Sequence, residues 1–355
     1  MFAFYCVEWG MRDLFINFIT TLIVDKIQKA EYYRFTATDF CWFMETLMKK
    51  LTVKKLGYSL GAEVLGVDLS EPLSEDQLRI IRDVWTEHQV LVFPKQELGP
   101  ETLLTFSRNF GELDNFSSQP FNRHPEYDEI FMLSNKPIDG KIPPGSTGGQ
   151  NWHTDLSYTT RPAKATLVYC VEKPLVGGDT MFANMYDAYD TLSPVLQQFL
   201  DNMEAVHDVN LITAKRPPEI VAEFARLNPP VVHPAVRVHP ESKRKALYVN
   251  PRTRCFVGMT EAESAPLIKY LSDHSISPKF IYRHRWSVGD LVMWDNRCLT
   301  HLAVGDFDRS EIRHMLRTST MGDYFGRYED ENAVAEQKRT AGDKKLAVEL
   351  STLHD

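Results

Sequence analysis

The stretch GGQNWHTDLSY (residues 148–158) places His153 two positions before Asp155, directly after a pair of glycines. Successive side chains of an extended strand point to opposite faces, so both residues lie on one side if the segment is a strand, and Thr154 lies on the other. An imidazole beside a carboxylate could bind a metal ion, relay a proton, or form a hydrogen bond within the pair. Most such triplets are surface polar residues, so the pair alone does not decide its role.

A metal site needs at least one further ligand, and His301 is the strongest candidate among the 11 histidines. It follows an apolar run, DLVMW (290–294), and a polar bend, where the chain returns from one strand to the next. Two histidines and one carboxylate form the facial triad of non-haem Fe(II) oxygenases. Ordinary structural roles are expected for His124, His233 and His239 in loop-like sequence beside prolines, His284 alternating with Tyr282 and Trp286, and His314 and His354 at the surface.

Two arginines follow His301 at a spacing that suits a bound carboxylate. An open iron site usually needs an electron-donating co-substrate, and 2-oxoglutarate would present a carboxylate that a guanidinium binds through two hydrogen bonds. Arg313 and Arg317 stand four residues apart in RHMLRTSTMGD (313–323), so in a strand they face the same side and flank Met315. A pair of ordinary surface arginines is the alternative interpretation.

Charge and cysteine content restrict the classes of function. The chain has 355 residues, of which 43% are hydrophobic and 25% charged, as in a globular protein with a substantial core. Its net charge of −8 argues against nucleic-acid binding, which needs a basic surface. The apolar run at 14–24 is shorter than the roughly 20 residues of a membrane span. Five scattered cysteines without a C-x-x-C pair indicate a reducing compartment, so we expect a cytoplasmic protein without a membrane partner.

Many short strand-like runs with turn residues between them predict an α+β protein with a double-stranded β-helix (jelly-roll) core and flanking helices. Ser74 and Gln77 fit a capping box at the start of one helix, and Pro100 and Gly111 bracket a second. A single helical insert is expected at 186–203. These helices would pack against one face of the strands.

The composition divides the chain into three parts. We expect an N-terminal extension at 1–47, a single enzymatic domain at 48–325 and a charged C-terminal tail at 326–355. Within the domain, residues 138–150 are rich in glycine and proline and lead directly to His153, so this loop is a candidate lid.

The chain resembles the taurine dioxygenase and 2,4-dichlorophenoxyacetate dioxygenase family of Fe(II)- and 2-oxoglutarate-dependent oxygenases, from about residue 51 to residue 323. The resemblance rests on four stretches in matching order and at matching intervals: NWHTD (151–155), GGDTMFANM (177–185), YRHRWSVGDLVMWDNRCLTH (282–301) and RHMLR (313–317). It implies that His153, Asp155 and His301 bind Fe(II), and that Arg313 and the hydroxyl of Thr180 bind 2-oxoglutarate.

The resemblance also implies a reaction and a substrate class. O2 and 2-oxoglutarate would be consumed, succinate and CO2 released, and a small anionic organic substrate hydroxylated at the carbon next to its heteroatom. Arg317 would bind the anionic group, Asn151 would help to orient the substrate, and Trp294 would be an aromatic neighbour of the metal. A homodimer or homotetramer is expected from the resemblance alone.

One departure from the family pattern concerns substrate choice. Where the taurine branch has a substrate-binding histidine after FGEL, this chain has Asp114, and an ionised aspartate would repel a sulfonate. An aryloxyalkanoate or another carboxylic acid is therefore favoured over taurine. Two rival interpretations remain, namely a metal-dependent hydrolase or lyase on a jelly-roll scaffold, and a family member without catalytic activity. The paired arginines and Thr180 argue against the hydrolase, which needs no 2-oxoglutarate site, and the three intact ligand types argue against an inactive member.

Overall fold

The structure is a computed structural model that describes residues 51–117, 122–137, 149–212, 218–332 and 334–335. The expected extension at 1–47 lies outside these residues, as do the expected lid loop up to residue 148 and the expected tail from residue 336 onward. No helix in the described part of the chain is long and apolar enough to cross a membrane.

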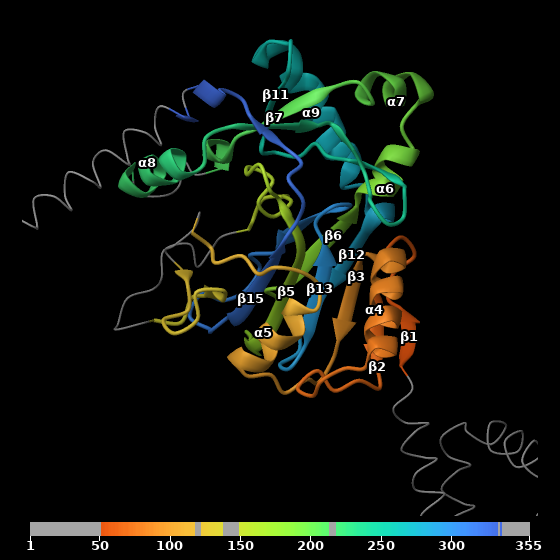
Figure 1. Ribbon diagram of the computed structural model, residues 1–355, viewed down its shortest axis with the longest axis vertical. Helices are drawn as coiled ribbons and strands as arrows, with labels where there is room; N and C mark the ends of the chain where they lie inside the picture. Colours follow the sequence, from red (N-terminus) through yellow and green to blue (C-terminus); the bar gives the residue numbers. More distant parts are fainter. Residues whose placement is uncertain (1–50, 118–121, 138–148, 213–217, 333, 336–355) are drawn as a thin grey trace, which may run out of the picture. The chain divides into compact units, whose positions relative to one another are not determined.

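Short strands and short helices alternate along the chain (Figure 1). The α-helices are α4 (Glu75–His88), α5 (Pro100–Arg108), α6 (Met185–Asp190), α7 (Pro194–Leu200), α8 (Pro218–Leu227) and α9 (Glu261–Ser275). The strands are β1 (Thr52–Lys55), β2 (Ala62–Leu65), β3 (Val90–Phe93), β4 (Phe131–Ser134), β5 (Ala163–Glu172), β6 (Thr180–Asn184), β7 (Glu204–His207), β8 (Val231–Pro234), β9 (Val236–Val238), β10 (Lys245–Leu247), β11 (Thr253–Phe256), β12 (Ile281–His284), β13 (Leu291–Asp295), β14 (Leu299–Ala303), β15 (His314–Met321) and β16 (Arg327–Tyr328).

Two sheets of unequal size make the framework. The larger has seven strands in the order β1-β2-β3-β13-β5-β15-β4, and the smaller has three in the order β12-β6-β14. Strand side chains alternate between the two faces of a sheet, so alternate residues of β3 belong to two different hydrophobic clusters, one on each face of the large sheet. Leu91 and Phe93 of β3 pack with Trp85 of α4, whereas Val90 and Val92 pack with residues of the small sheet. The large sheet is therefore covered by helices on one face and by the small sheet on the other.

The two helices on the outer face form where the sequence predicts them. The side chain of Ser74 accepts a hydrogen bond from the backbone N–H of Gln77, and the side-chain oxygen of Gln77 accepts one from the backbone N–H of Ser74, so the capping box of α4 is confirmed. Pro100 is the first residue of α5, as predicted. Together with the sheets, the helices make a mixed α and β fold, as expected. The prediction of one helical insert at 186–203 is wrong, because α6 ends at Asp190 and a second helix, α7, starts at Pro194 with Ser193 as its N-cap.

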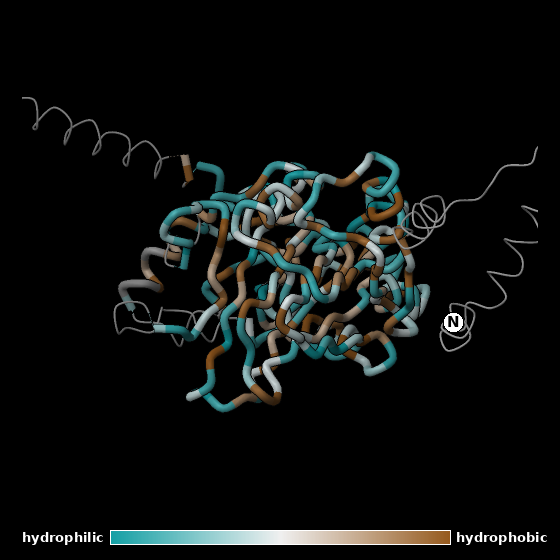
Figure 2. Tube along the Cα trace, turned by 90° about the horizontal axis from the view of Figure 1, so that it is seen from below, coloured by the Kyte–Doolittle hydropathy of each residue, from teal (hydrophilic) through white to brown (hydrophobic). Residues whose placement is uncertain are grey.

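Figure 2 shows hydrophilic stretches along many of the outer turns of the backbone and hydrophobic stretches among those toward its middle. A further sheet, in the order β11-β7-β8-β16, carries two buried histidines. His233 lies within β8 and is fully buried, so its expected place in a loop is wrong. His239 follows β9 as a loop residue but is also fully buried.

Candidate metal and substrate site

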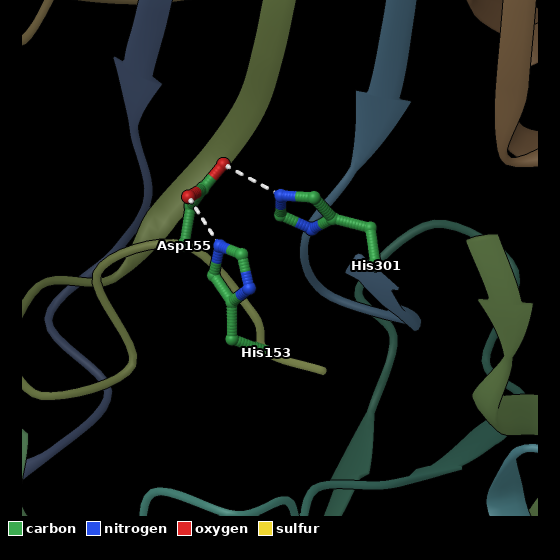
Figure 3. A group of neighbouring side chains, drawn as sticks. All are labelled: His153, Asp155 and His301. Atoms are coloured by element: carbon green, nitrogen blue, oxygen red, sulfur yellow. Dashed lines mark ion pairs between the residues drawn. The ribbon is translucent and has the colours of Figure 1, made fainter. Parts of the chain in front are cut away.

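His153, Asp155 and His301 come together from two segments that are about 150 residues apart in sequence, and Figure 3 shows the carboxylate of Asp155 facing both imidazole rings. His301 lies on β14, and His153 pairs with it through an isolated bridge in which each backbone N–H donates to the other's carbonyl, at 2.9 and 2.8 Å. The expectation of a strand at 153–155 is therefore met only at His153, because Asp155 already belongs to a turn.

The donor atoms lie close enough to share one ion. Nε2 of His153 is 3.6 Å from Oδ1 of Asp155, and Nε2 of His301 is 3.7 Å from Oδ2. All three side chains are buried, and their ligand atoms lie within 4.8 Å of one another. Nδ1 of His153 donates a hydrogen bond to the backbone carbonyl of Asn151 at 2.7 Å, which leaves Nε2 as the nitrogen that faces a metal ion. Two imidazoles and one carboxylate on one side are the donor set of a facial triad with Fe(II).

Burial prepares the imidazoles for a metal. It lowers the pKa of His153 and holds the pKa of His301 well below its usual value, so both rings are neutral at neutral pH. Burial acts in the opposite direction on the carboxyl of Asp155, but Arg317 and His301 hold its pKa well below the usual range. The triad therefore presents two neutral nitrogens and one anionic oxygen without prior proton loss.

Two residues that sequence reasoning missed hold Asp155 in place. Thr166 on β5 donates its hydroxyl to Oδ2 of Asp155 at 2.9 Å. The amide of Asn296 donates to that hydroxyl oxygen at 2.9 Å, and its carbonyl accepts from the backbone of Asp155 at 3.2 Å. Trp294 donates its indole N–H to the same carbonyl at 3.2 Å. This network fixes the orientation of the carboxylate, as outer partners do in metal sites.

Arg317 of β15 reaches the triad across the space between the two sheets. Its Nη1 lies 3.4 Å from Oδ1 of Asp155, and its Nε donates to Ser319 at 3.2 Å. Nη2 is buried without a hydrogen-bond partner in the described structure. The guanidinium lies 5.4 Å from the ring of Phe116 and 5.5 Å from that of Phe131. The expected interior position of Arg317 is thus observed, and the surface interpretation fails for this residue.

Asp114 stands close to Arg317 and is also buried. Its Oδ1 accepts from the backbone of Phe116 at 3.0 Å, whereas Oδ2 has no hydrogen-bond partner among the described residues. Burial raises the pKa of this carboxyl, although Phe116 and Arg317 act against that shift. A buried carboxyl of this kind is more easily protonated than an exposed one, which weakens the argument that Asp114 must repel an anion.

Arg313 and Thr180 have no described contact with the triad, although Thr180 pairs with Ala303, two residues beyond His301, on β14. Arg313 precedes β15 and donates Nε to the carbonyl of Gly178 at 3.0 Å, and no carboxylate of the described chain lies within ion-pair distance of it. Burial lowers its pKa to about 10. Gly178 has a positive φ of 70°, and a Cβ there would lie 3.3 Å from Arg313, so glycine leaves room for the guanidinium. Thr180 accepts from the indole of Trp286 at 3.1 Å.

The remaining expected residues differ in their closeness to the triad. The ring of Trp294 lies 4.8 Å from that of His301, so it is an aromatic neighbour of the site. The side chain of Asn151 is exposed, and only its backbone carbonyl contacts the triad. A second buried group of possible metal ligands consists of His239, Asp295 and Cys298. Arg297 already donates hydrogen bonds to both carboxylate oxygens of Asp295, which leaves this group less suited to a metal ion.

A family model described as "Taurine catabolism dioxygenase TauD, TfdA family" matches residues 52–319. The chain belongs to this dioxygenase family. Members of it depend on 2-oxoglutarate, and this dioxygenase uses Fe(II), 2-oxoglutarate and O2. The match spans the triad, Arg313, Arg317 and the network of Thr166 and Asn296. The donor set described above fits the iron, so the expected family and cofactors are confirmed.

Alignments with known relatives span most of this chain. The 2,4-dichlorophenoxyacetate dioxygenase of Cupriavidus pinatubonensis is 35% identical over 283 residues, covering 74% of this chain and 95% of the relative. The sulfonate dioxygenase of Saccharomyces cerevisiae is 32% identical over 292 residues, covering 78% and 68%. Among solved structures, a taurine dioxygenase from Burkholderia xenovorans aligns with a TM-score of 0.65 at 32% identity, over 77% of this chain and 91% of that one. AAD-2 in complex with Mn(II) and N-oxalylglycine gives 0.68 at 28% identity, over 77% and 97%.

Proposed function

We propose that this dioxygenase hydroxylates a small organic acid at the carbon next to its heteroatom, with conversion of 2-oxoglutarate to succinate and CO2. The observation that carries this proposal is the contact between Arg317 and Asp155, because it places a buried guanidinium directly beside the metal-binding carboxylate. Relatives are named for aryloxyalkanoates and for sulfonates, and both substrates are small anions. A redox-neutral hydrolase or lyase is not supported, because the family is one of dioxygenases.

The residues take distinct parts in this proposal. His153, Asp155 and His301 would hold Fe(II), and the metal with its bound co-substrate supplies the oxidising chemistry. Arg313 and Thr180 would bind the distal carboxylate of 2-oxoglutarate. Thr180 already accepts a hydrogen bond from Trp286, so its own proton is free for a carboxylate oxygen. Arg313 has its positive charge unpaired by any described acid, which suits the same carboxylate.

Arg317 would bind the anionic group of the substrate through Nη2, its unpaired nitrogen. Phe116 and Phe131 flank this guanidinium and would contact an apolar or aromatic part of the substrate. Burial raises the pKa of Asp114, and in its protonated form this carboxyl would donate a hydrogen bond from Oδ2 where the taurine branch uses a histidine. An aryloxyalkanoate fits such surroundings better than taurine. Asn151 would act through its carbonyl on His153 and not on the substrate.

We also propose a jelly-roll fold and domain limits for this dioxygenase, and the family match supports both. The seven-stranded and three-stranded sheets, with the triad between them, would form a double-stranded β-helix (jelly roll). The enzymatic domain would extend over residues 48–325, within which the family match at 52–319 falls. The resemblance to the family is the only support for a homodimer or homotetramer.

Succinate formation tests the proposed function directly. Full-length protein supplied with Fe(II), ascorbate, 2-oxoglutarate and O2 should form succinate, and phenoxyacetates should accelerate it more than taurine does. The matched control is His301→Ala, which should abolish succinate formation and Fe(II) binding while the far-ultraviolet circular dichroism spectrum is unchanged. A wild-type protein that binds Fe(II) and forms no succinate with any of these acids would contradict the proposal.

A further inference from the structure

Arg252 is a buried arginine that neither the motifs nor the family resemblance singled out. It lies in the turn that leads into β11, and its backbone is fixed on both sides. The backbone N–H of Arg252 donates to the side chain of Asn250 at 2.9 Å, and its carbonyl accepts from Asp208 at 2.8 Å. Such a turn holds the start of the side chain in one place, which is a requirement for a recognition residue.

The guanidinium of Arg252 extends to the candidate metal site. Its Nη1 donates to the backbone carbonyl of Thr154 at 3.0 Å, and Thr154 is the residue between His153 and Asp155. Its centre lies 5.1 Å from the ring of Tyr158, a cation–π distance. The whole side chain is only 8% exposed. Arg252 therefore approaches the triad from the side of the sheet that contains β11, whereas Arg317 approaches from β15.

The charge of Arg252 is not balanced by an acid of its own. Its Nε is buried without a hydrogen-bond partner, and no carboxylate of the described chain lies within 4 Å of the guanidinium. Arg297, equally buried, shows the usual arrangement, because it binds Asp295 and Glu241 at 2.6 Å each. Burying a cation without a partner is costly, so such a group usually has a ligand or a catalytic task.

Two further polar residues near Arg252 have buried atoms without partners. Both ring nitrogens of His207 and the hydroxyl of Tyr248 lack hydrogen bonds in the described structure, and the two rings are 5.3 Å apart. His207 pairs across the sheet with Thr253, the residue after Arg252, and a second guanidinium, that of Arg237, lies 5.6 Å from the ring of Tyr248. Unsatisfied donors around an unpaired cation are what a bound oxyanion would satisfy.

On the basis of the proposed function, we propose that Arg252 is a second recognition residue for the substrate's anionic group, which it binds through Nε while Arg317 binds it through Nη2. Arg317 contacts Asp155, and Arg252 contacts Thr154, the residue before it, so an acid held between the two guanidiniums would lie beside the metal ligands. Two cations facing one substrate also disfavour any ammonium group on it. The structure thus favours a simple carboxylic or sulfonic acid, such as an aryloxyalkanoate, over a zwitterion such as taurine.

Binding to an unreactive complex tests this proposal apart from turnover. Full-length protein is loaded with Mn(II) and N-oxalylglycine and titrated calorimetrically with phenoxyacetate and with phenoxyethanol, its uncharged counterpart. Wild type should bind the acid more tightly than the alcohol. Arg252→Gln should lower the affinity for the acid about 10- to 100-fold and leave the affinity for the alcohol unchanged. Arg252→Lys should lose less of the affinity for the acid than Arg252→Gln does. Arg254→Gln, two residues further along and paired with Glu329, is the matched control and should resemble wild type.

Three results would overturn the assignment. Equal weakening of acid and alcohol in Arg252→Gln would mean that Arg252 only supports the backbone of Thr154. Unchanged affinity for the acid would mean that Arg252 does not contact it. A wild-type preference for taurine over ethanesulfonate would contradict the expected rejection of an ammonium group. Failure of the wild type to bind N-oxalylglycine would instead contradict the proposed function, so the two failures are distinguishable.

Discussion

Nη1 of Arg317 lies 3.4 Å from Oδ1 of Asp155, so a buried guanidinium adjoins the metal-binding carboxylate while its Nη2 has no hydrogen-bond partner among the described residues. We expect a residue in this position to couple metal and substrate binding, because it stabilises the ionised form of Asp155 and keeps Nη2 for a second anion. The coupling distinguishes Arg317 from Arg313, which has no described contact with the triad.

Replacement of Arg317 should therefore have two effects. We expect Arg317→Gln to raise the KM for an acidic substrate and also to weaken Fe(II) binding about 10-fold, since outer partners typically change metal affinity by about 10- to 100-fold. Fe(II) affinity can be measured by anaerobic titration and KM by succinate release. Arg317→Lys should recover more of the iron affinity than of the substrate affinity, because a lysine keeps the charge but loses the fork of donors. Full retention of iron affinity in Arg317→Gln would show that the contact with Asp155 is incidental.

Thr166 gives a sharper test of the network behind Asp155. Thr166→Val removes the hydroxyl that donates to Oδ2 at 2.9 Å and changes the side-chain volume little. We expect Fe(II) affinity to fall about 10-fold, with the melting temperature lowered by only a few degrees. Thr300→Val is the control, because Thr300 adjoins His301 and is buried, yet its hydroxyl has no hydrogen-bond partner in the described structure. Equal iron affinity in the two variants would contradict a role for Thr166.

Arg313 should control the affinity for 2-oxoglutarate and little else. Arg313→Gln is expected to raise the KM for 2-oxoglutarate about 10- to 100-fold, the range for loss of a charge-assisted hydrogen bond. The exposed Arg309, four residues earlier, provides the control in Arg309→Gln. Burial lowers the pKa of Arg313 to about 10, and the guanidinium is charged below that pH. The wild-type KM should therefore stay constant from pH 7 to 9, and a rise across that interval would contradict the assignment.

The sequence predicts the triad because each ligand has a strong local signal. His153 and Asp155 are neighbours in the chain, and His301 follows an apolar strand at a bend, so their types and surroundings are visible without coordinates. The helix after Ser74 is predicted for a similar reason, since its capping box lies within four residues. Arg317 is predicted to face inward by strand alternation, and the structure places it there.

The supporting residues were missed because their contacts are distant in sequence. Asn296 stands in a polar bend that looks like an ordinary turn, yet its partners Asp155 and Thr166 are 141 and 130 residues away. Arg252 follows a proline in an apparent surface turn, and its contact with Thr154 spans 98 residues. The error at His233 has the same origin, because the adjacent proline suggests a loop while tertiary packing buries the ring within β8.

His233 should make the stability of the fold depend on pH. The ring is fully buried, lies 5.2 Å from the ring of His207 and stacks on that of Phe325 at 5.4 Å, and a Cβ added at Gly326 would lie 2.2 Å from it. Burial, with a contribution from Arg237, lowers the pKa of His233 from 6.5 to about 4. Because this pKa is lower in the folded state, the stabilisation is complete above pH 6.5 and is lost as the pH falls toward 4.

The size of this effect follows from the shift. A pKa that is about 2.5 units lower in the folded state corresponds to about 3 kcal/mol of unfolding free energy, lost progressively between pH 6.5 and 4. His233→Gln cannot gain a proton, so its unfolding free energy should fall less steeply over this interval than that of the wild type. Urea unfolding at half-unit pH steps measures both slopes. Since His207 is shifted in the same direction, His207→Gln/His233→Gln should be flatter still, and identical slopes in all three proteins would show that neither ring is buried in its neutral form.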